Sequence, residues 1–444
     1  MCTSTLHIRP NSPLGMSYDV PCGKCLECRS LSQNSWVTRL GFDLKDLYDR
    51  GGVAVFLTFT YNNESLPKCS FLSDELIPCF SRQDVLTFFN KLKVSVNRQY
   101  GKGKYKYFFC SEYGKFTKRP HYHGLFLLEP SVDSTWFSEK CRSLWHHGYM
   151  FPRYKNGRYL DNLGSATTVE IRNRNAACKY VSKYITKDLD YFGLPQITHY
   201  MEIRDNLSVD MRNYFNGCLP RHYQSKGIGS SLLKDGINAD KLLDFVCNGI
   251  FNPTTCKVDA LPRYYVEKLC FDHHRIVVDG EVKVIRSLNL SYADVMREIH
   301  RQSFTSKIRQ LSNFNLNATL NVFLSHGYSV SDFTRFKNLQ DIYSPRQIVL
   351  QRWYDRLTPE CKYLFHTLNY DGLTLDNLVN FRVDLYTLFV DTFISKFDDV
   401  NDDVSWYMGV FDDITKRDRS LANEMRYNDY LRVLQLKLIK QHLL

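Results

Sequence analysis

The sequence lacks the long apolar run that a membrane-spanning helix needs. No stretch of its 444 residues approaches the roughly twenty apolar residues that cross a bilayer. Residues Met1–Pro10 are polar and have no continuous apolar core, so no secretory signal peptide is expected. The 14 cysteines therefore do not indicate a secreted disulfide framework. A reducing cytoplasm is the expected environment, in which most cysteines act as small buried hydrophobic residues.

Fixed-period repeats, low-complexity segments and a phosphate-binding glycine loop of the G-x-x-x-x-G-K-[ST] type are also lacking. A helicase activity is therefore not expected. The chain does have 43% hydrophobic and 14% aromatic residues, enough for a buried core in one large domain or a few smaller ones. Its formal charge of +11 favours a polyanionic partner, because lysines and arginines release the counterions around phosphates. Charge alone does not select DNA over RNA or a membrane surface.

The apolar patterns of the first half predict an α+β fold. Helices are expected at residues 22–50, from Ser81 onward, at 137–145 and at 173–187. Strands are expected at residues 53–61, 105–113, 121–128 and 166–171. This order fits an antiparallel sheet with helices on one side. Residues 62–80 and 204–229 look like loops, whereas 261–269, 292–311 and most of 339–444 have helical patterns. We therefore expect a first domain at 1–235 and a mainly helical region of unknown role at 236–444.

A His-x-His pair begins the strand expected at 121–128. Residues two apart in a strand point to the same face, so His121 and His123 project together while Tyr122 faces the other way. A tight hairpin would bring Glu112 of the preceding strand beside them. Two imidazoles and a carboxylate suit Mg²⁺ or Mn²⁺ with coordination positions left open for a phosphate oxygen. The alternatives are a solvent-facing histidine pair and a Glu112 that forms a salt bridge with Lys115 or Arg119.

Two tyrosines lie four residues apart on the helix expected at 173–187. Tyr180 and Tyr184 would share one face of that helix, with Lys183 close to both. A phenol with a pKa near ten is a poor nucleophile at neutral pH, but a nearby ammonium group or metal ion stabilises both the phenolate and the developing phosphate charge. The pattern indicates two nucleophiles for DNA cleavage. Aromatic packing of the tyrosines onto the sheet is the alternative.

Together these segments resemble the HUH endonuclease superfamily, in particular the rolling-circle replication initiation proteins of microviruses of the gokushovirus type. The resemblance rests on Phe56–Tyr61, Arg119–Gly124 and Tyr180–Tyr184, in that order, and on the segment Pro21–Arg29. It covers roughly residues 15–235 and does not extend over the last third. The aromatic Tyr122 between the histidines departs from the usual aliphatic residue, so its hydroxyl needs a partner in the core.

The resemblance implies an antiparallel five-stranded, RRM-like sheet with the histidines on a central strand and the tyrosine helix beside it. It also implies nicking of a phage origin, in supercoiled and single-stranded DNA, through a 5′-phosphotyrosine link, followed by religation of unit-length circles. The work would take place in the cytoplasm of a host bacterium, with a host helicase and polymerase as partners and no membrane. Other interpretations are a transposase or plasmid initiator of the same superfamily, and a non-catalytic module that binds single-stranded DNA.

A cysteine cluster with the spacing C-x-x-C-x-x-C precedes the first expected helix. Cys22, Cys25 and Cys28 provide three ligands, and a closed structural zinc site needs a fourth. Cys69, Cys79 or Cys110 could supply it in three dimensions. A helix start with buried thiols is the alternative to a structural Zn²⁺.

Basic residues gather around both predicted catalytic segments. Those expected to contact DNA phosphates are Lys115, Lys118, Arg119, Arg172, Arg174, Lys179 and Lys187. Lys102, Lys104 and Lys106 could extend this groove, with Tyr105, Tyr107 and Phe116 available for base stacking. An ordinary basic surface is the alternative interpretation.

Overall fold

The computed structural model of the chain describes residues 6–8, 18–20, 26–114, 118–161, 166–171, 189–234, 236–253, 255–278, 281–355 and 402–442. The chain forms two compact units that are interleaved in sequence. The first, the sheet unit, comprises Arg29–Gly236 and Gly249–Tyr265. The second, the helical unit, comprises Met1–Cys28, Ile237–Asn248 and Val266–Leu444. The expected division of roles at residue 235 stays a prediction.

An antiparallel sheet forms the centre of the sheet unit. Its strands follow the order β12 (Glu170–Ile171), β3 (Val53–Thr60), β7 (Pro120–Leu128), β6 (Tyr105–Tyr113) and β13 (His222–Gln224). A further short strand, β8 (Met150–Phe151), also pairs with β3. The predicted α+β class and five-stranded antiparallel path are confirmed. The histidine strand β7 occupies the middle of that path, as the resemblance implied.

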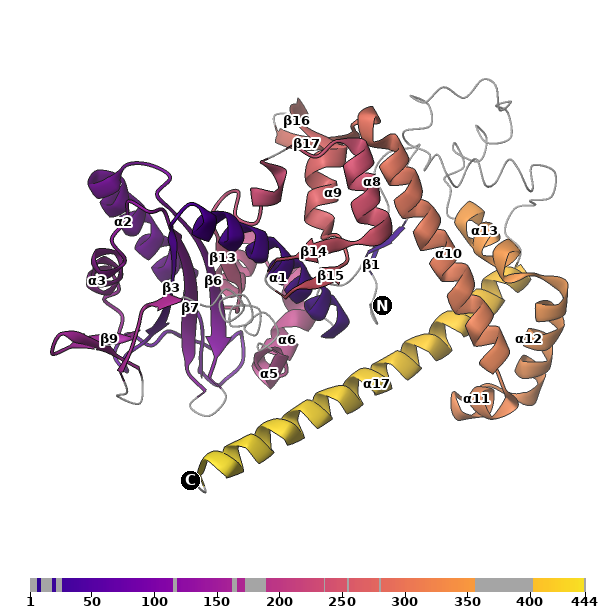
Figure 1. Ribbon diagram of the computed structural model, residues 1–444. Coiled ribbons are helices and arrows are strands. Elements are labelled where there is room, and N and C mark those ends of the chain that lie inside the picture. The colour runs from indigo at the N-terminus through magenta and orange to yellow at the C-terminus, as the bar shows by residue number, and fades with distance from the viewer. Residues whose placement is uncertain are drawn as a thin grey trace. The chain divides into compact units, whose positions relative to one another are not determined.

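Helices cover both faces of this sheet (Figure 1). The helices α2 (Arg82–Tyr100) and α3 (Ser134–Leu144) pack on one face through a core that includes Phe88, Phe126 and Phe137. The helix α1 (Leu26–Asp49) packs on the other face, where Leu40 and Leu44 share a core with strand residues such as Phe108 and Leu125. The expectation of helices on one side is therefore wrong for α1. The helix α2 begins where expected, since the Ser81 side chain accepts a hydrogen bond from the Asp84 backbone amide.

The alternation of β7 separates catalytic candidates from core. Residues 122, 124, 126 and 128 face α2 and α3, whereas 121, 123, 125 and 127 face the α1 side. Tyr122 is fully buried, and its hydroxyl accepts a hydrogen bond from the Ser81 backbone amide at 3.1 Å and lies 3.3 Å from the Tyr61 hydroxyl. The core partner that the tyrosine hydroxyl needed is thus present.

Tyr122→Phe should destabilise the sheet unit by about 1–3 kcal/mol, because the buried amide of Ser81 loses its acceptor at the start of α2. The measurement is the free energy of unfolding of this unit in a urea titration. Tyr154→Phe is the control, since Tyr154 is 47% exposed and its change should stay within about 0.5 kcal/mol. Equal stability of the two variants would contradict the assigned role of the hydroxyl.

Two segments of the sheet unit differ from their expected structure. Residues 204–229, expected as a loop, contain a 3₁₀ turn (Arg204–Asn206), α7 (Val209–Gly217) and the edge strand β13. The strand expected at 166–171 is divided, because β11 (Ala166–Thr167) pairs with β10 whereas β12 pairs with β3. The remaining elements are β4 (Lys68–Cys69), β5 (Ile77–Pro78), β9 (Arg153–Lys155), β10 (Arg158–Leu160), α5 (Leu189–Phe192), α6 (Pro195–Ile203), a 3₁₀ turn (Ser231–Leu233), β14 (Ile250–Asn252) and β15 (Lys257–Asp259).

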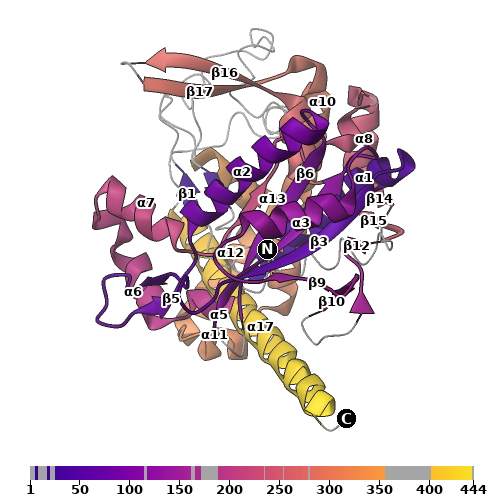
Figure 2. The same ribbon diagram turned by 90° about the vertical axis from the view of Figure 1, so that its left-hand side faces the viewer.

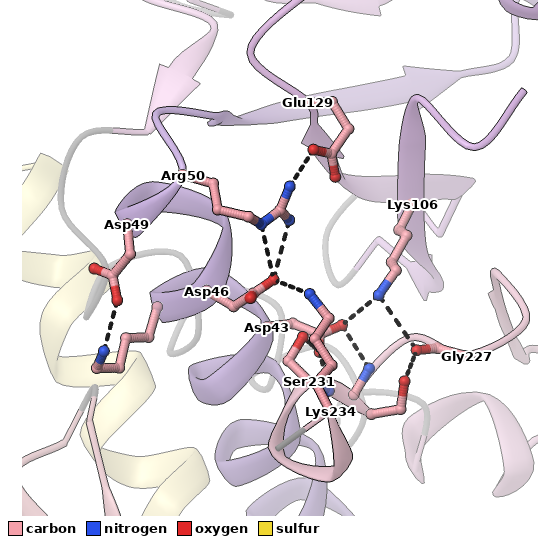
Figure 3. A network of polar contacts seen from close by, with 12 residues as sticks. Asp43, Asp46, Asp49, Arg50, Lys106, Glu129, Gly227, Ser231 and Lys234 are labelled. Atoms are coloured by element: carbon pink, nitrogen blue, oxygen red, sulfur yellow. Dashed lines mark hydrogen bonds and ion pairs between the residues drawn. The ribbon is translucent and has the colours of Figure 1, made fainter. Parts of the chain in front are cut away.

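A polar network ties α1 to the segment that follows β13 (Figure 3). Asp43 is buried, and its carboxylate accepts hydrogen bonds from the Gly229 amide at 2.6 Å and from both the amide and the hydroxyl of Ser231. Lys106 lies 3.7 Å from the same carboxylate. Asp46, one turn along α1, pairs with Lys234 at 2.6 Å. These bonds offset the cost of burying the Asp43 charge and fix α1 against the sheet.

The helical unit contains a core built from α10 (Ala293–Asn317), α11 (Leu320–Ser325), α12 (Val330–Ile342), α13 (Pro345–Asp355) and α17 (Asp402–His442). It also includes β1 (Leu6–Ile8), β2 (Tyr18–Val20), α8 (Ala239–Asn248) and a 3₁₀ turn (Leu290–Tyr292); α9 (Arg263–Cys270) spans the boundary between the units. The helical expectation for the C-terminal region is confirmed. The hairpin of β16 (Phe271–Val278) and β17 (Glu281–Leu288), visible in Figure 2, was not predicted. Among the described helices, none is long and apolar enough to span a membrane.

Candidate metal centre

Three predicted ligands converge on the α1-side face of the sheet. Glu112 of β6 is directly opposite His121 of β7 in the strand register, and Cys110 is opposite His123. The Glu112 Oε2 atom lies 3.0 Å from His121 Nε2 and 2.6 Å from His123 Nε2. One ligand atom from each of the three residues lies within 4.8 Å of the others. The structure therefore brings together the three residues that the hairpin argument selected.

The outer imidazole nitrogens have partners that orient both rings. His121 Nδ1 lies 3.1 Å from the carbonyl oxygen of Arg119 and donates to it, because a carbonyl can only accept. His123 Nδ1 lies 3.0 Å from the Thr58 hydroxyl on the neighbouring strand β3. The His123 ring also stacks on Phe56, with 5.7 Å between the ring centres. Hydrogen bonds of this kind fix the tautomer and the orientation of metal-binding histidines.

The chemistry of the donor set fits a divalent cation. With Nδ1 protonated, a neutral imidazole presents a lone pair at Nε2. In His121 and His123 this atom faces a carboxylate oxygen of Glu112, which is also an acceptor. Such an arrangement is favourable only when a proton or a cation lies between the groups. Nitrogen and oxygen ligands in a group of three leave coordination positions open, which suits Mg²⁺ or Mn²⁺.

The burial of the three side chains is graded. The side chains of His123 and Glu112 are only 8% and 10% exposed, whereas that of His121 is 21% exposed. The group is thus reached from the His121 side, toward the end of β7 at which the hairpin from β6 arrives. Tyr122 cannot act here, because it points to the opposite face and burial raises the pKa of its hydroxyl.

Thr58 is a residue that the sequence argument did not single out, although it lies in the quoted segment Phe56–Tyr61. Thr58→Val removes the oxygen bonded to His123 Nδ1 while keeping the side-chain shape. We expect the affinity for Mn²⁺ to fall about 10- to 100-fold, the usual effect of losing such a partner. Calorimetric titration with Mn²⁺ measures this. Thr58→Ser keeps the hydroxyl and should bind like the wild type; equal losses in both variants would count against the hydrogen bond.

The predicted nucleophiles lie outside the described residues. This holds for Tyr180, Tyr184 and Lys183, for the predicted DNA contacts Arg172, Arg174, Lys179, Lys187 and Lys115, for the stacking candidate Phe116 and for Cys22 and Cys25. Their assigned roles stay predictions.

The predicted DNA contacts that are described have different surroundings. Lys118 is exposed beside the metal group, whereas Arg119 donates hydrogen bonds to Asn63 and to the carbonyl oxygen of Tyr61. Lys106 is engaged with Asp43 and so does not extend a groove; Lys102 is exposed and Lys104 half-buried. Base stacking on Tyr105 and Tyr107 is corrected, because both pack against the core on the face opposite the histidines and Tyr107 stacks on Phe89.

The candidates for a fourth zinc ligand lie in different places. Cys69 and Cys79, on and after the short strands β4 and β5, interact with Cys218 at the end of α7. Cys110 is buried in the sheet next to His123. Cys28 is buried as well. Among the described residues, only Glu112, His121 and His123 form a group that could hold a metal. The structural zinc site therefore stays a prediction.

Sequence reasoning missed the segment 149–160, which carries β8, β9 and β10. A charge signal was available, because the sequence has no acidic residue between Glu139 and Asp161 and has basic residues at Arg153, Lys155 and Arg158. Its aromatic residues are described below.

The fold and the site define an α+β domain with a His–His–Glu metal-binding group on the central strand of an antiparallel sheet. Residues 54–189, which contain all three ligands, match a family model described as replication-associated protein ORF2. The segment that carries the site belongs to this family, and the resemblance predicted from the motifs is confirmed.

Two curated relatives have the same kind of name. The chain is 28% identical over 141 residues to the replication-associated protein ORF2 of Spiroplasma virus 4 and 31% identical over 146 residues to the replication-associated protein VP4 of Bdellovibrio phage phiMH2K. The matched parts cover 29% and 30% of this chain and 42% of each relative. The chain thus spans less than half the length of the curated relatives it matches. No solved structure matches significantly.

Proposed function

We propose that the protein initiates rolling-circle replication of a phage genome by nicking one DNA strand at an origin and later rejoining it. The convergence of Glu112, His121 and His123 on the central strand carries this proposal. The family match supports it, because residues 54–189 also include Tyr180 and Tyr184. The formal charge of +11 is consistent with a nucleic-acid substrate.

The metal group has a limited and definite role in this proposal. The residues that would hold the ion are His121 and His123 through Nε2 and Glu112 through its carboxylate. A Mg²⁺ or Mn²⁺ ion bound there polarises the scissile phosphate and neutralises part of its charge. Thr58 and the Arg119 carbonyl keep both rings oriented. The burial of Glu112 and His123 limits the access of bulk water to their side of the group.

The proposed cleavage is a transesterification by Tyr180 or Tyr184. The phenolic oxygen forms a bond to phosphorus, the bond between phosphorus and the 3′ oxygen breaks, and the proton lost by the phenol is balanced by one gained at the 3′ hydroxyl. The product is a 5′-phosphotyrosine that keeps the energy of the phosphodiester. Lys183 would stabilise the phenolate and the developing negative charge. A second tyrosine lets one residue hold the first 5′ end while the other makes the second cut.

The proposed cycle joins the cut end to itself after one round of synthesis and releases a unit-length single-stranded circle. Unwinding and synthesis would come from a host helicase and polymerase, since the sequence has no phosphate-binding glycine loop. The substrate would be the phage origin in supercoiled and single-stranded form, in the cytoplasm of the host bacterium. The role of the helical unit is open to the docking of such partners.

The test is an adduct assay with the full chain and labelled single-stranded DNA that carries the candidate origin. We expect a denaturation-resistant protein–DNA adduct with Mn²⁺ or Mg²⁺ and none with EDTA. Absence of an adduct under all conditions would overturn the proposal and favour a non-catalytic module that binds single-stranded DNA. A transposase or plasmid initiator would also form an adduct, but it would cut the ends of its own element and not a phage origin.

A further inference from the structure

An aromatic and basic cluster lies on the same sheet face as the metal group. β8 pairs with β3 so that Phe151 is opposite Thr58, and Thr58 is in turn opposite His123 on β7. Residues directly opposite each other in adjacent strands place their side chains on the same face. Phe151 and Tyr149, two residues before it, therefore share the face of the histidines. Two strand spacings, roughly 10 Å, separate β8 from β7.

Arg153 completes this cluster. Its guanidinium lies 4.6 Å from the ring centre of Tyr149 and 4.7 Å from that of Phe151. Tyr149 is nevertheless 54% exposed, and Arg153 is exposed as well. The neighbouring strands β9 and β10, which form a hairpin beside the sheet in Figure 2, add exposed Lys155 and Arg158. Exposed rings with an arginine and no acidic neighbour in sequence are what stacked bases and phosphates require.

The backbone that carries the cluster is held in place before any ligand arrives. The Tyr149 carbonyl accepts hydrogen bonds from the amide and the hydroxyl of Thr60 at 2.8 and 3.0 Å. Arg142 of α3 donates to the carbonyl oxygens of Met150 and Pro152. Gly148 permits this approach, because a Cβ atom there would lie 2.4 Å from the Thr60 carbonyl oxygen. A site fixed by its scaffold loses little entropy on binding.

We propose that Tyr149, Phe151 and Arg153 form a nucleotide-binding subsite that holds single-stranded DNA beside the metal group. A base stacks on the exposed ring of Tyr149, and Arg153 pairs with a backbone phosphate while Phe151 supports it from below. The subsite would position the strand that runs through the metal group. This inference rests on the proposed function in one respect, the choice of single-stranded DNA as the ligand.

The experiment measures equilibrium binding of the full chain to a fluorescein-labelled single-stranded oligonucleotide in EDTA, where no cleavage can occur. Tyr149→Ala should weaken binding about tenfold, the effect of losing one stacked base. Tyr149→Phe keeps the ring and should bind like the wild type. Tyr214→Ala, in α7, removes a tyrosine that is 60% exposed and should also leave binding unchanged. Thermal unfolding confirms that all variants fold.

Two further readouts separate binding from a merely structural effect. Arg153→Ala should reduce the slope of log K against log salt by about 0.7, the contribution of one phosphate contact to single-stranded DNA, whereas Arg153→Lys should retain it. An oligonucleotide with 2-aminopurine at successive positions should show one position whose fluorescence is quenched by the wild type and not by Tyr149→Ala. Binding of Tyr149→Ala within about twofold of the wild type, or an unchanged salt slope for Arg153→Ala, would overturn the subsite.

The outcome is distinguishable from that of the proposed function. If the subsite variants lose binding in EDTA while the wild type forms no covalent adduct with any metal, the subsite stands and the nicking proposal fails. If the wild type forms the adduct and the variants bind like it, the nicking proposal stands and the subsite fails.

Discussion

Replacing both Tyr180 and Tyr184 by phenylalanine should reduce covalent adduct formation by at least about a thousand-fold, because no phenolic oxygen remains to attack the phosphate. The binding of single-stranded DNA in EDTA should stay close to that of the wild type, since each change removes a single hydroxyl. The measurement is the amount of denaturation-resistant adduct formed with Mn²⁺ over time. Each single variant should keep part of the activity if the two tyrosines alternate.

The control for this pair is Tyr214→Phe, which removes a hydroxyl from an exposed tyrosine in α7 and should leave the adduct yield unchanged. An adduct that persists in the double variant would show that the nucleophile is another residue. Peptide mapping of the adduct would then identify it. Comparing the two single variants on an origin with one cleavage site would reveal which tyrosine makes the first cut.

Removing a ligand of the metal group should have the second largest effect. His121→Ala, His123→Ala and Glu112→Gln should each lower the rate of adduct formation at least about 100-fold, because losing even an indirect partner of a metal ligand costs 10- to 100-fold. Glu112→Gln is the sharpest of these variants, since it keeps the shape of the side chain and removes the negative charge that faces both Nε2 atoms. Calorimetry with Mn²⁺ should show a parallel loss of affinity.

The matched control is His199→Ala, because His199 is an exposed histidine on α6. Its adduct rate and Mn²⁺ affinity should equal those of the wild type. Full activity of Glu112→Gln at low Mn²⁺ concentration would remove Glu112 from the ligand set. Loss of activity without loss of Mn²⁺ affinity would instead show that the three residues act on the DNA directly.

The arrangement of the histidine strand could be predicted because it depends on local alternation. The period of two places His121 and His123 on one face and Tyr122 on the other, whatever the rest of the fold does. The position of Glu112 followed from the short hairpin between β6 and β7. Both inferences needed only the sequence of adjacent strands.

Elements that depend on distant partners could not be predicted in this way. β13 has three residues in a polar segment, and it is a strand because the edge of β6 offers it hydrogen bonds. The position of Tyr149 and Phe151 depends on the pairing of β8 with β3, which lies about ninety residues earlier in the chain. The hairpin of β16 and β17 was predictable, because the sequence Asp279-Gly280 between two β-branched runs is a strong turn signal.

The interleaving of the two units has a consequence for limited proteolysis. Residues 237–248 belong to the helical unit, whereas 249–265 return to the sheet unit. In the returning segment Tyr264 stacks on Arg39 of α1, and Asp259 accepts a hydrogen bond from Thr38. A protease that cuts once between residues 236 and 249 leaves the sheet unit in two pieces that still hold each other through α1. No single cut can release either unit whole, so the nicked protein should migrate as one species until it is denatured.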